Sequence, residues 1–132
     1  MRSRDEIVKC LEDLTAKYEE EVCRLATTMR QPECSAEDYS QMRGRQLALE
    51  VSQKGIENLF IYYLKENLPV AVMVLVKEIR DCIALHTKHY INYPKPWYSK
   101  LEIMKWKSCN DTYEEVIKQL ELVPTDQAGC SA

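Results

Sequence analysis

Glycine and proline are scarce in this 132-residue chain, which contains three glycines and five prolines. An all-β sandwich or barrel needs a turn about every 8–12 residues, and so few turn-forming residues do not supply them. Long apolar runs are also missing, since the longest spans residues 68–76 and falls far short of the ~20 residues that cross a bilayer. These absences exclude an all-β fold and a membrane-spanning helix, and they favour an all-α fold.

A net excess of basic charge is absent as well. The formal net charge is −3, whereas a dedicated nucleic-acid-binding domain is normally basic overall. The charge is unevenly distributed, because residues 77–107 carry seven basic and three acidic side chains, a local charge of +4, while the rest of the chain carries −7. This segment is therefore the first candidate for a binding surface.

The six cysteines contain no Cys-x-x-Cys pair. Cys10 and Cys82 lie within helical apolar patterns, where a free cysteine behaves as a small hydrophobic residue. The first residues lead directly into an amphipathic helix without the apolar segment of a signal peptide. We therefore expect a reduced, cytoplasmic protein.

Two long helices are predicted to form an antiparallel hairpin. Ser3 and Glu6 have the spacing of a capping box, and the apolar residues that follow recur with a helical period, which predicts a helix over about 4–30. Pro32 ends this helix, and a second cap then begins a helix over about 36–66. The connection between them is short, so the two helices are expected to fold back on one another.

Two further helices complete the predicted fold. A third helix, over about 69–88, is expected to be the central and most buried one, because apolar side chains recur along it at helical spacing. Proline and aromatic residues over 90–100 predict a loop, and residues 97–107 fit a short helix or a short strand equally. A last, short helix is expected over about 112–122, after a cap near Asn110–Thr112.

We expect one helical domain over residues 1–124, because a chain of this length builds a single core. A small polar tail over 125–132 is expected to be frayed. The predicted fold is thus all-α, with a long antiparallel hairpin, a buried third helix and a short C-terminal helix around one core.

The second predicted helix carries more apolar surface than one neighbour can cover. From Leu59 to Leu64 it is apolar nearly all round, and such a helix is buried on every side. Either the later helices cover this surface or a second copy of the chain does, in a homodimer with two-fold symmetry. We expect the homodimer.

The segment 86–107 holds both histidines, both tryptophans, five lysines and five of the chain's eleven aromatic residues. Aromatic faces interleaved with lysines suit stacking on a base and neutralising a phosphate, and Trp and Tyr are also common anchors of protein–protein interfaces. The alternative is that the aromatic side chains pack the loop against the helices while the lysines face water. The candidate binding residues are His86, His89, Tyr90, Tyr93, Lys95, Trp97, Tyr98, Lys100, Lys105, Trp106 and Lys107.

One short motif lies at the start of this segment. The sequence from Arg80 to His86, Arg-Asp-Cys-Ile-Ala-Leu-His, resembles the arginine-to-histidine motif of the HEPN superfamily, including the polar residue directly after the arginine. That superfamily consists of small all-helical proteins, many of them dimeric ribonucleases. The resemblance implies that Arg80 would stabilise the phosphate and that His86 would assist proton transfer at the ribose 2′-hydroxyl.

No metal site or cofactor is expected. Cys82, His86 and His89 could share one face of a helix, but a zinc site would need a fourth ligand, and none stands at helical spacing. The chain has no glycine-rich phosphate-binding loop, no zinc-protease motif and no nucleophile elbow.

These observations predict a small cytosolic, non-enzymatic binding or regulatory protein that acts on a protein partner through the segment 86–107. Small compact proteins of this kind often act as inhibitors or adaptors of larger machines, including those carried by phages and mobile elements. The alternatives are a HEPN-like ribonuclease that uses Arg80 and His86, and a module that binds a nucleotide or nucleic acid.

Overall fold

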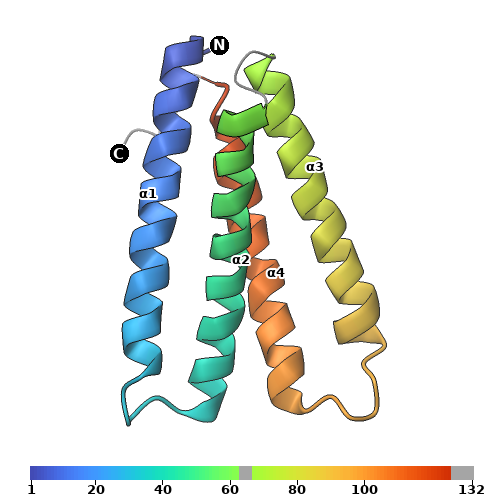
Figure 1. The fold of residues 1–132 in the computed structure, drawn as a ribbon. Coiled ribbons are helices and arrows are strands. Elements are labelled where there is room, and N and C mark those ends of the chain that lie inside the picture. Colours follow the sequence, from blue (N-terminus) through green and yellow to red (C-terminus); the bar gives the residue numbers. More distant parts are fainter. Residues whose placement is uncertain (63–66, 126–132) are drawn as a thin grey trace.

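The computed structural model describes residues 1–62 and 67–125, and in these ranges it contains helices and no strand (Figure 1). The predicted all-α fold is therefore confirmed. The elements are α1 (Arg4–Met29), α2 (Ala36–Tyr62), α3 (Leu68–His86), the π-helical segment η1 (Thr87–Asn92) and α4 (Lys100–Leu122).

The two caps that begin the hairpin form as predicted. Ser3 and Glu6 make a reciprocal capping box, in which the Glu6 N–H donates to Ser3 Oγ at 3.2 Å and the Ser3 N–H donates to Glu6 Oε1 at 3.0 Å. At the start of α2, the Asp38 N–H donates to Ser35 Oγ at 3.0 Å. The described part of α2 ends at Tyr62, so the last residues of the predicted 36–66 helix lie outside the described residues.

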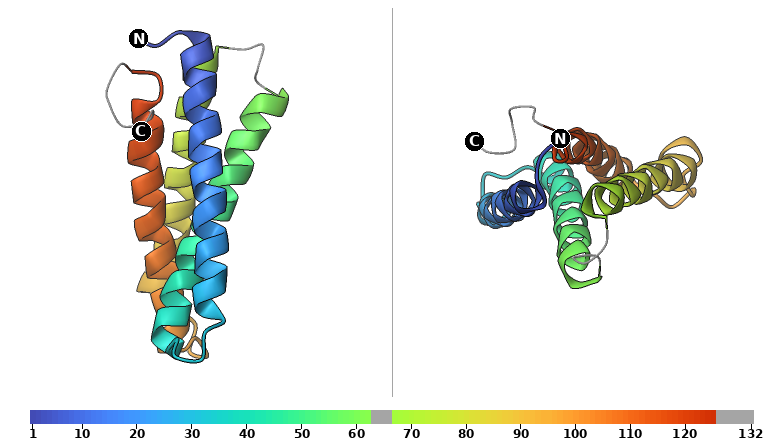
Figure 2. Two further views of the ribbon diagram at one scale, coloured as in Figure 1. Left: turned by 90° about the vertical axis from the view of Figure 1, so that its left-hand side faces the viewer. Right: turned by 90° about the horizontal axis from the view of Figure 1, so that it is seen from above.

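The helices form a bundle in which α2 packs against the three other α-helices, most extensively against α4. Seen from above, the C-terminal end of α2 projects outward from the other three helices (Figure 2). One continuous core draws on all four α-helices. The most completely buried apolar side chains of the core include Ile7, Leu11, Leu49, Ile56, Leu68, Val72, Val76, Val116, Leu120 and Val123.

Gly44 lets α2 and α4 approach closely. A Cβ atom at this position would lie 2.0 Å from the backbone oxygen of Lys105 and 3.0 Å from the backbone nitrogen of Cys109. Next to this contact, Ser108 Oγ donates to the Gln41 carbonyl oxygen at 2.6 Å. The two helices therefore meet backbone to backbone where α4 leaves the candidate site.

Arg45 connects three helices from its position on α2. Its Nε donates to Glu21 of α1 at 2.6 Å, and its Nη1 donates to Glu115 of α4. The hydrogen bond to Glu21, and then that to Glu115, raise the pKa of Arg45 against the opposing effect of burial. This bridge holds α1 and α4 in register on the two sides of α2.

The last helix is much longer than predicted. It begins at Lys100, where the Glu102 N–H donates to Ser99 Oγ at 3.2 Å, and not near 112. Asn110 and Thr112, which the sequence suggested as caps, are buried in the middle of α4. Thr112 Oγ1 instead donates to the Ser108 carbonyl oxygen, one turn back in the same helix.

The third helix differs from the prediction in two ways. It is buried on one face only, because Val70, Met73, Val74 and Leu85 are exposed, and α2 rather than α3 is the central helix. The helical path also continues through η1 to Asn92, so the predicted loop over 90–100 shortens to the link 93–99. Within the described residues, no helix combines the length and apolarity needed to cross a membrane.

Candidate functional site

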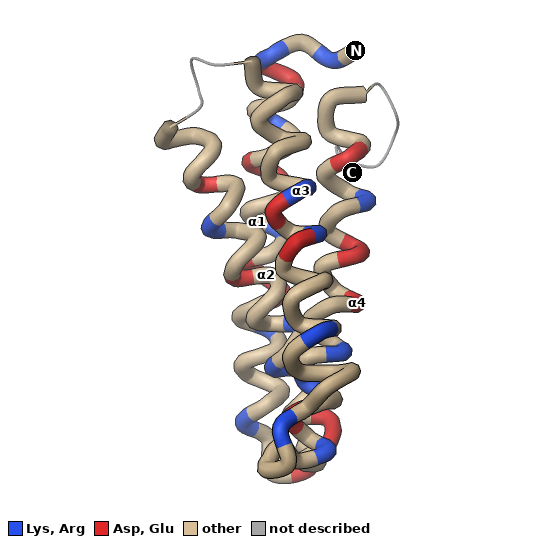
Figure 3. Tube along the Cα trace, turned by 90° about the vertical axis from the view of Figure 1, so that its right-hand side faces the viewer, with Lys and Arg blue, Asp and Glu red and all other residues tan. Residues whose placement is uncertain are grey.

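The candidate site lies at one end of the bundle, where η1, the link 93–99 and the first turns of α4 meet. Figure 3 shows lysines and arginines gathered in the lower part of the face that α3, η1 and α4 form. The predicted aromatic residues, together with His86, fall into a packed group and an exposed group there. Four rings pack against each other and form the aromatic stack, which consists of His86, Tyr90, Tyr98 and Trp106.

The aromatic stack joins η1 to α4. The rings of Tyr90 and Trp106 lie nearly parallel, with their centroids 4.4 Å apart and their planes at 12°. The His86 ring is 4.6 Å from that of Trp106, and Tyr98 lies 5.8 Å from Tyr90 on the side of the link. Contacts of this kind stabilise a cluster beyond simple burial, and all four residues are only partly exposed. These four residues therefore pack η1 and the link against α4, whereas the packing interpretation of the sequence also included Tyr93 and Trp97, which are exposed.

Asn110 fixes the orientation and tautomer of His86. The Asn110 side-chain nitrogen donates to the Ile83 carbonyl oxygen at 3.4 Å and to Thr87 Oγ1 at 3.2 Å. Its oxygen is thus left to accept from His86 Nδ1 at 3.0 Å, so Nδ1 carries the proton. Burial lowers the pKa of His86, and the hydrogen bond to Asn110 only partly opposes this.

Two large aromatic side chains project from the stack into solvent. Tyr93 is 76% exposed and Trp97 is 75% exposed, and we call them the outer aromatic pair. The Trp97 ring meets the edge of Tyr98 with centroids 6.2 Å apart, so the packed stack supports it from one side. Lys95 Nζ lies 6.0 Å from the Trp97 ring centroid. An indole and a cation are therefore presented together at the tip of the bundle.

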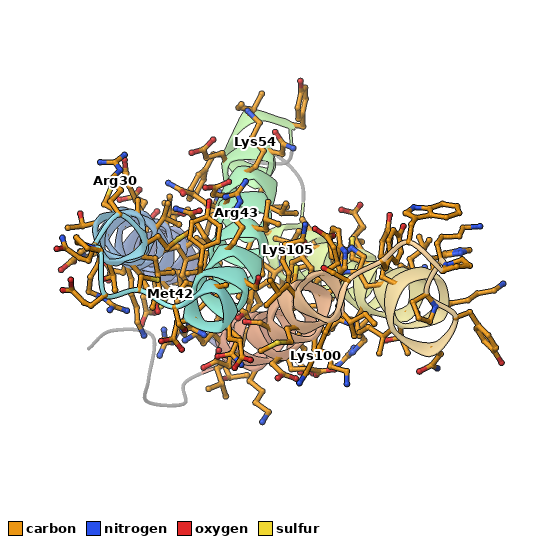
Figure 4. The ribbon with its side chains drawn as sticks, turned by 90° about the horizontal axis from the view of Figure 1, so that it is seen from below. Arg30, Met42, Arg43, Lys54, Lys100 and Lys105 are labelled. Atoms are coloured by element: carbon orange, nitrogen blue, oxygen red, sulfur yellow. The ribbon has the colours of Figure 1, made fainter. Side chains whose placement is uncertain are left out.

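The other predicted basic residues face different directions. Lys105 pairs with Glu102 at 3.2 Å, lies 4.9 Å from the Trp106 ring centroid and is largely buried. Lys100 and Lys107 are exposed, as is His89 on η1. Figure 4 shows Lys105 and Lys100 on opposite sides of α4. The structure therefore does not bring all eleven predicted residues onto one continuous face.

The two thiols near the stack are poor nucleophiles and poor metal ligands at neutral pH. Burial raises the pKa of Cys109 to about 12 and also raises the pKa of Cys82. Thiolates are the reactive and metal-binding form, so both side chains stay protonated. Among the described residues, no three His, Cys, Asp or Glu side chains are grouped so that they could hold a metal ion.

The Arg80–His86 motif spans two separate environments. Arg80 pairs with Glu121 of α4 at 3.3 Å, whereas His86 belongs to the aromatic stack. Six residues correspond to about 9 Å of helix rise and about 120° of rotation. The two side chains therefore leave α3 in different directions. The ribonuclease interpretation stays a prediction, and an RNA-cleavage assay of the wild type with R80A and H86A variants tests it.

Sequence reasoning missed Asn110 and Thr87 as part of this site. Asn110 was interpreted as a helix cap, since asparagine side chains often satisfy free backbone groups at helix ends. Its spacing from His86 carries no local signal, because the two residues lie on different helices. Only the packing of α3 against α4 brings them together.

Comparison with known proteins found no similarity on which to base a function. No model of a protein family matches the chain. Searches of the curated proteins and of the solved structures also gave no match. The function must therefore be inferred from the chemistry of the site itself.

Proposed function

We propose that this chain is a small, non-enzymatic cytosolic binding protein, of the inhibitor or adaptor type, that engages a protein partner through the outer aromatic pair. The observation that carries the proposal is Trp97, a large indole that is 75% exposed. Exposed tryptophan and tyrosine side chains on a packed support are typical anchors of protein–protein interfaces. Because the packed stack backs Trp97, little side-chain entropy would be lost on binding.

The charge around Trp97 indicates the chemistry of the partner. Lys95 lies beside the indole, and Lys88 and Lys100 are exposed on the adjoining elements. We infer that the partner presents an apolar pocket for Trp97 with carboxylates around its rim. Rim charges of opposite sign steer association and make it depend on salt.

Two further aspects of this proposal concern compartment and assembly. The cysteines in the described ranges are free thiols, which fits a reducing compartment such as the cytoplasm. The exposed apolar side chains Ile61 and Tyr62 on α2 and Val74 on α3 favour a homodimer. A regulatory role in a phage or mobile element belongs to the same proposal.

Affinity purification with matched variants tests the proposed function. W97A and K95E are expected to lose at least nine-tenths of the recovered protein partner, because a central anchor and its rim charge are removed. Y39A is the control, since it removes an exposed tyrosine of α2 that belongs to neither proposed surface.

Nuclease treatment of the lysate distinguishes a protein partner from a nucleic-acid partner. A protein partner recovered equally after nuclease treatment, and lost with W97A, supports the proposal. If W97A instead abolishes binding of a single-stranded oligonucleotide measured by fluorescence, while no protein depends on Trp97, the nucleic-acid-binding alternative replaces it.

A further inference from the structure

The outer face of α3 is unusually apolar for an exposed helix surface. The inner face buries Val72, Val76 and Ile79 in the core. On the opposite side, the exposed apolar side chains are Val70, Met73, Val74, Ala84 and Leu85. A surface helix normally places polar residues on the face that points away from the core.

These exposed side chains form one stripe. At 100° per residue, they all lie within about 60° of a line drawn along the helix through Val70. Lys77 and Asp81 lie on the same line, in the middle of the stripe, and are 78% and 64% exposed. Figure 3 shows α3 running along the front of the molecule, with charged residues at its centre. The stripe is therefore apolar at both ends and carries one charge of each sign between them.

This order of apolar and charged residues along the stripe is complementary to that of a second, antiparallel copy. Two identical α3 helices can pack antiparallel about a two-fold axis that crosses their contact at the height of residue 79. Position 73 then faces position 85 of the other helix, and position 74 faces position 84. Met73 then meets Leu85, and Val74 meets Ala84, at both ends of the contact. In the middle, Lys77 of each helix faces Asp81 of the other.

We propose that the outer face of α3 is the seam of an antiparallel homodimer, held by two reciprocal Lys77–Asp81 ion pairs between apolar contacts. Within one chain these two side chains already lie 3.2 Å apart, so in the dimer four charges of alternating sign would form a closed ring. The inference gives the proposed homodimer its surface, and it is independent of the partner site at Trp97.

The charge pattern favours a second copy over an unrelated occupant. A foreign helix would have to carry apolar, acidic, basic and apolar residues at matching spacing, whereas a second copy provides them by symmetry. A groove of about 160 Å³ between α2 and α3, lined by Tyr62, Leu75 and Val74, adjoins the stripe and extends its apolar area. Burying this surface removes the exposed apolar patch from water.

Charge reversal with light scattering tests the seam. The wild type is expected at twice the 15.5 kDa chain mass. K77D places four acidic groups at the centre of the seam, and D81K places four basic groups there, so each variant is expected to raise the dimer Kd at least tenfold. The double variant K77D/D81K restores both ion pairs and should dimerise as the wild type does. An equimolar mixture of K77D and D81K should form a heterodimer, although each alone is monomeric.

A matched control is available on α1. Lys9 and Asp13 form the same exposed lysine–aspartate pair with the same spacing, at 3.1 Å, so K9D and D13K should leave the dimer intact. Circular dichroism of each variant checks that its helices are retained.

A wild type that stays monomeric at high concentration overturns the homodimer and the seam together. A dimer that K77D does not weaken overturns the seam alone. Binding of the protein partner, measured separately with W97A, distinguishes either outcome from a failure of the proposed partner site.

Discussion

At the scale of single residues, His86 is the most tightly constrained side chain of the candidate site. Three rings surround it, and Asn110 holds its Nδ1 proton. Because the Asn110 amide nitrogen is itself fixed by Ile83 and Thr87, the imidazole cannot rotate without breaking several contacts at once. His86 therefore links α3 to α4 through its contacts, and its burial there lowers the pKa of the imidazole.

This environment predicts a pH-dependent stability. The pKa of His86 is lowered in the folded state by burial, whereas an unfolded chain protonates its histidine near the ordinary value of about 6.5. The unfolded state therefore binds more protons, so the contribution of His86 is present above about pH 6.5 and is lost as the pH falls through the folded-state pKa. When the pH is lowered from 7.5 to 5.5, the free energy of unfolding measured in urea should fall more for the wild type than for H86N.

The control for this measurement is H89N, which removes the exposed histidine of the same segment. Carboxylates elsewhere in the chain also make stability depend on pH. The pH profile of H89N therefore has to be compared with that of H86N. If H89N flattens the pH profile as much as H86N does, His86 is not its origin.

At the scale of elements, the agreement between sequence and structure depends on whether the signal is local. The caps at Ser3 and Ser35 were predicted because each cap and its partner lie within one turn. Ser99 and Glu102 have the same spacing, but the prolines and aromatic residues just before them made the segment ambiguous. The start of α4 was therefore predictable in principle and was missed.

The division of the aromatic residues into packed and exposed groups was not predictable in the same way. It depends on η1, where the wider π-helical turn changes which side of the chain each residue faces. Tyr90 turns toward Trp106, and Tyr93, three residues later, points into solvent. The periodicity of an ordinary α-helix does not predict which of these aromatic residues are packed and which are exposed. Composition therefore located the site, whereas its geometry could be known only from the fold.

Two glycines on α2 give a matched prediction about helix packing. G44A should destabilise the protein by about 1–3 kcal/mol, because the new methyl group would clash with the backbone of α4, which cannot move aside. G55A meets only the end of the flexible Leu75 side chain, at 2.6 Å, and alanine favours the helix by up to ~1 kcal/mol. G55A should therefore stay within about 1 kcal/mol of the wild type. Chemical denaturation measures both, and equal effects would contradict the backbone contact.

At the scale of the whole molecule, one continuous core predicts one cooperative transition. Circular dichroism reports all helices, whereas tryptophan fluorescence is sensitive to Trp106 in the aromatic stack. The two probes should give the same midpoint in denaturant. L120A, which removes a fully buried side chain, should lower the unfolding free energy by about 2–5 kcal/mol and shift both curves together. A fluorescence transition at lower denaturant would instead show that the site end unfolds separately.

The bundle also separates its two proposed contacts in space. The link that carries the outer aromatic pair lies at one end of the bundle, while α3 runs along its side (Figure 1). The two surfaces use different residues, so a dimer built on α3 would leave both copies of Trp97 exposed. In a two-fold antiparallel arrangement the two tips would point in opposite directions, which suits a protein that connects two copies of its partner.

The contact between Gly44 and Lys105 also bears on the order in which the chain folds. The hairpin of α1 and α2 joins neighbouring segments, whereas this contact joins positions separated by all of α3 and η1. Closing so long a loop costs more entropy than closing the hairpin, and the cost precedes any gain from packing. We therefore expect the meeting of α2 and α4 to be a late event, so G44A would accelerate unfolding in stopped-flow measurements and leave the refolding rate nearly unchanged.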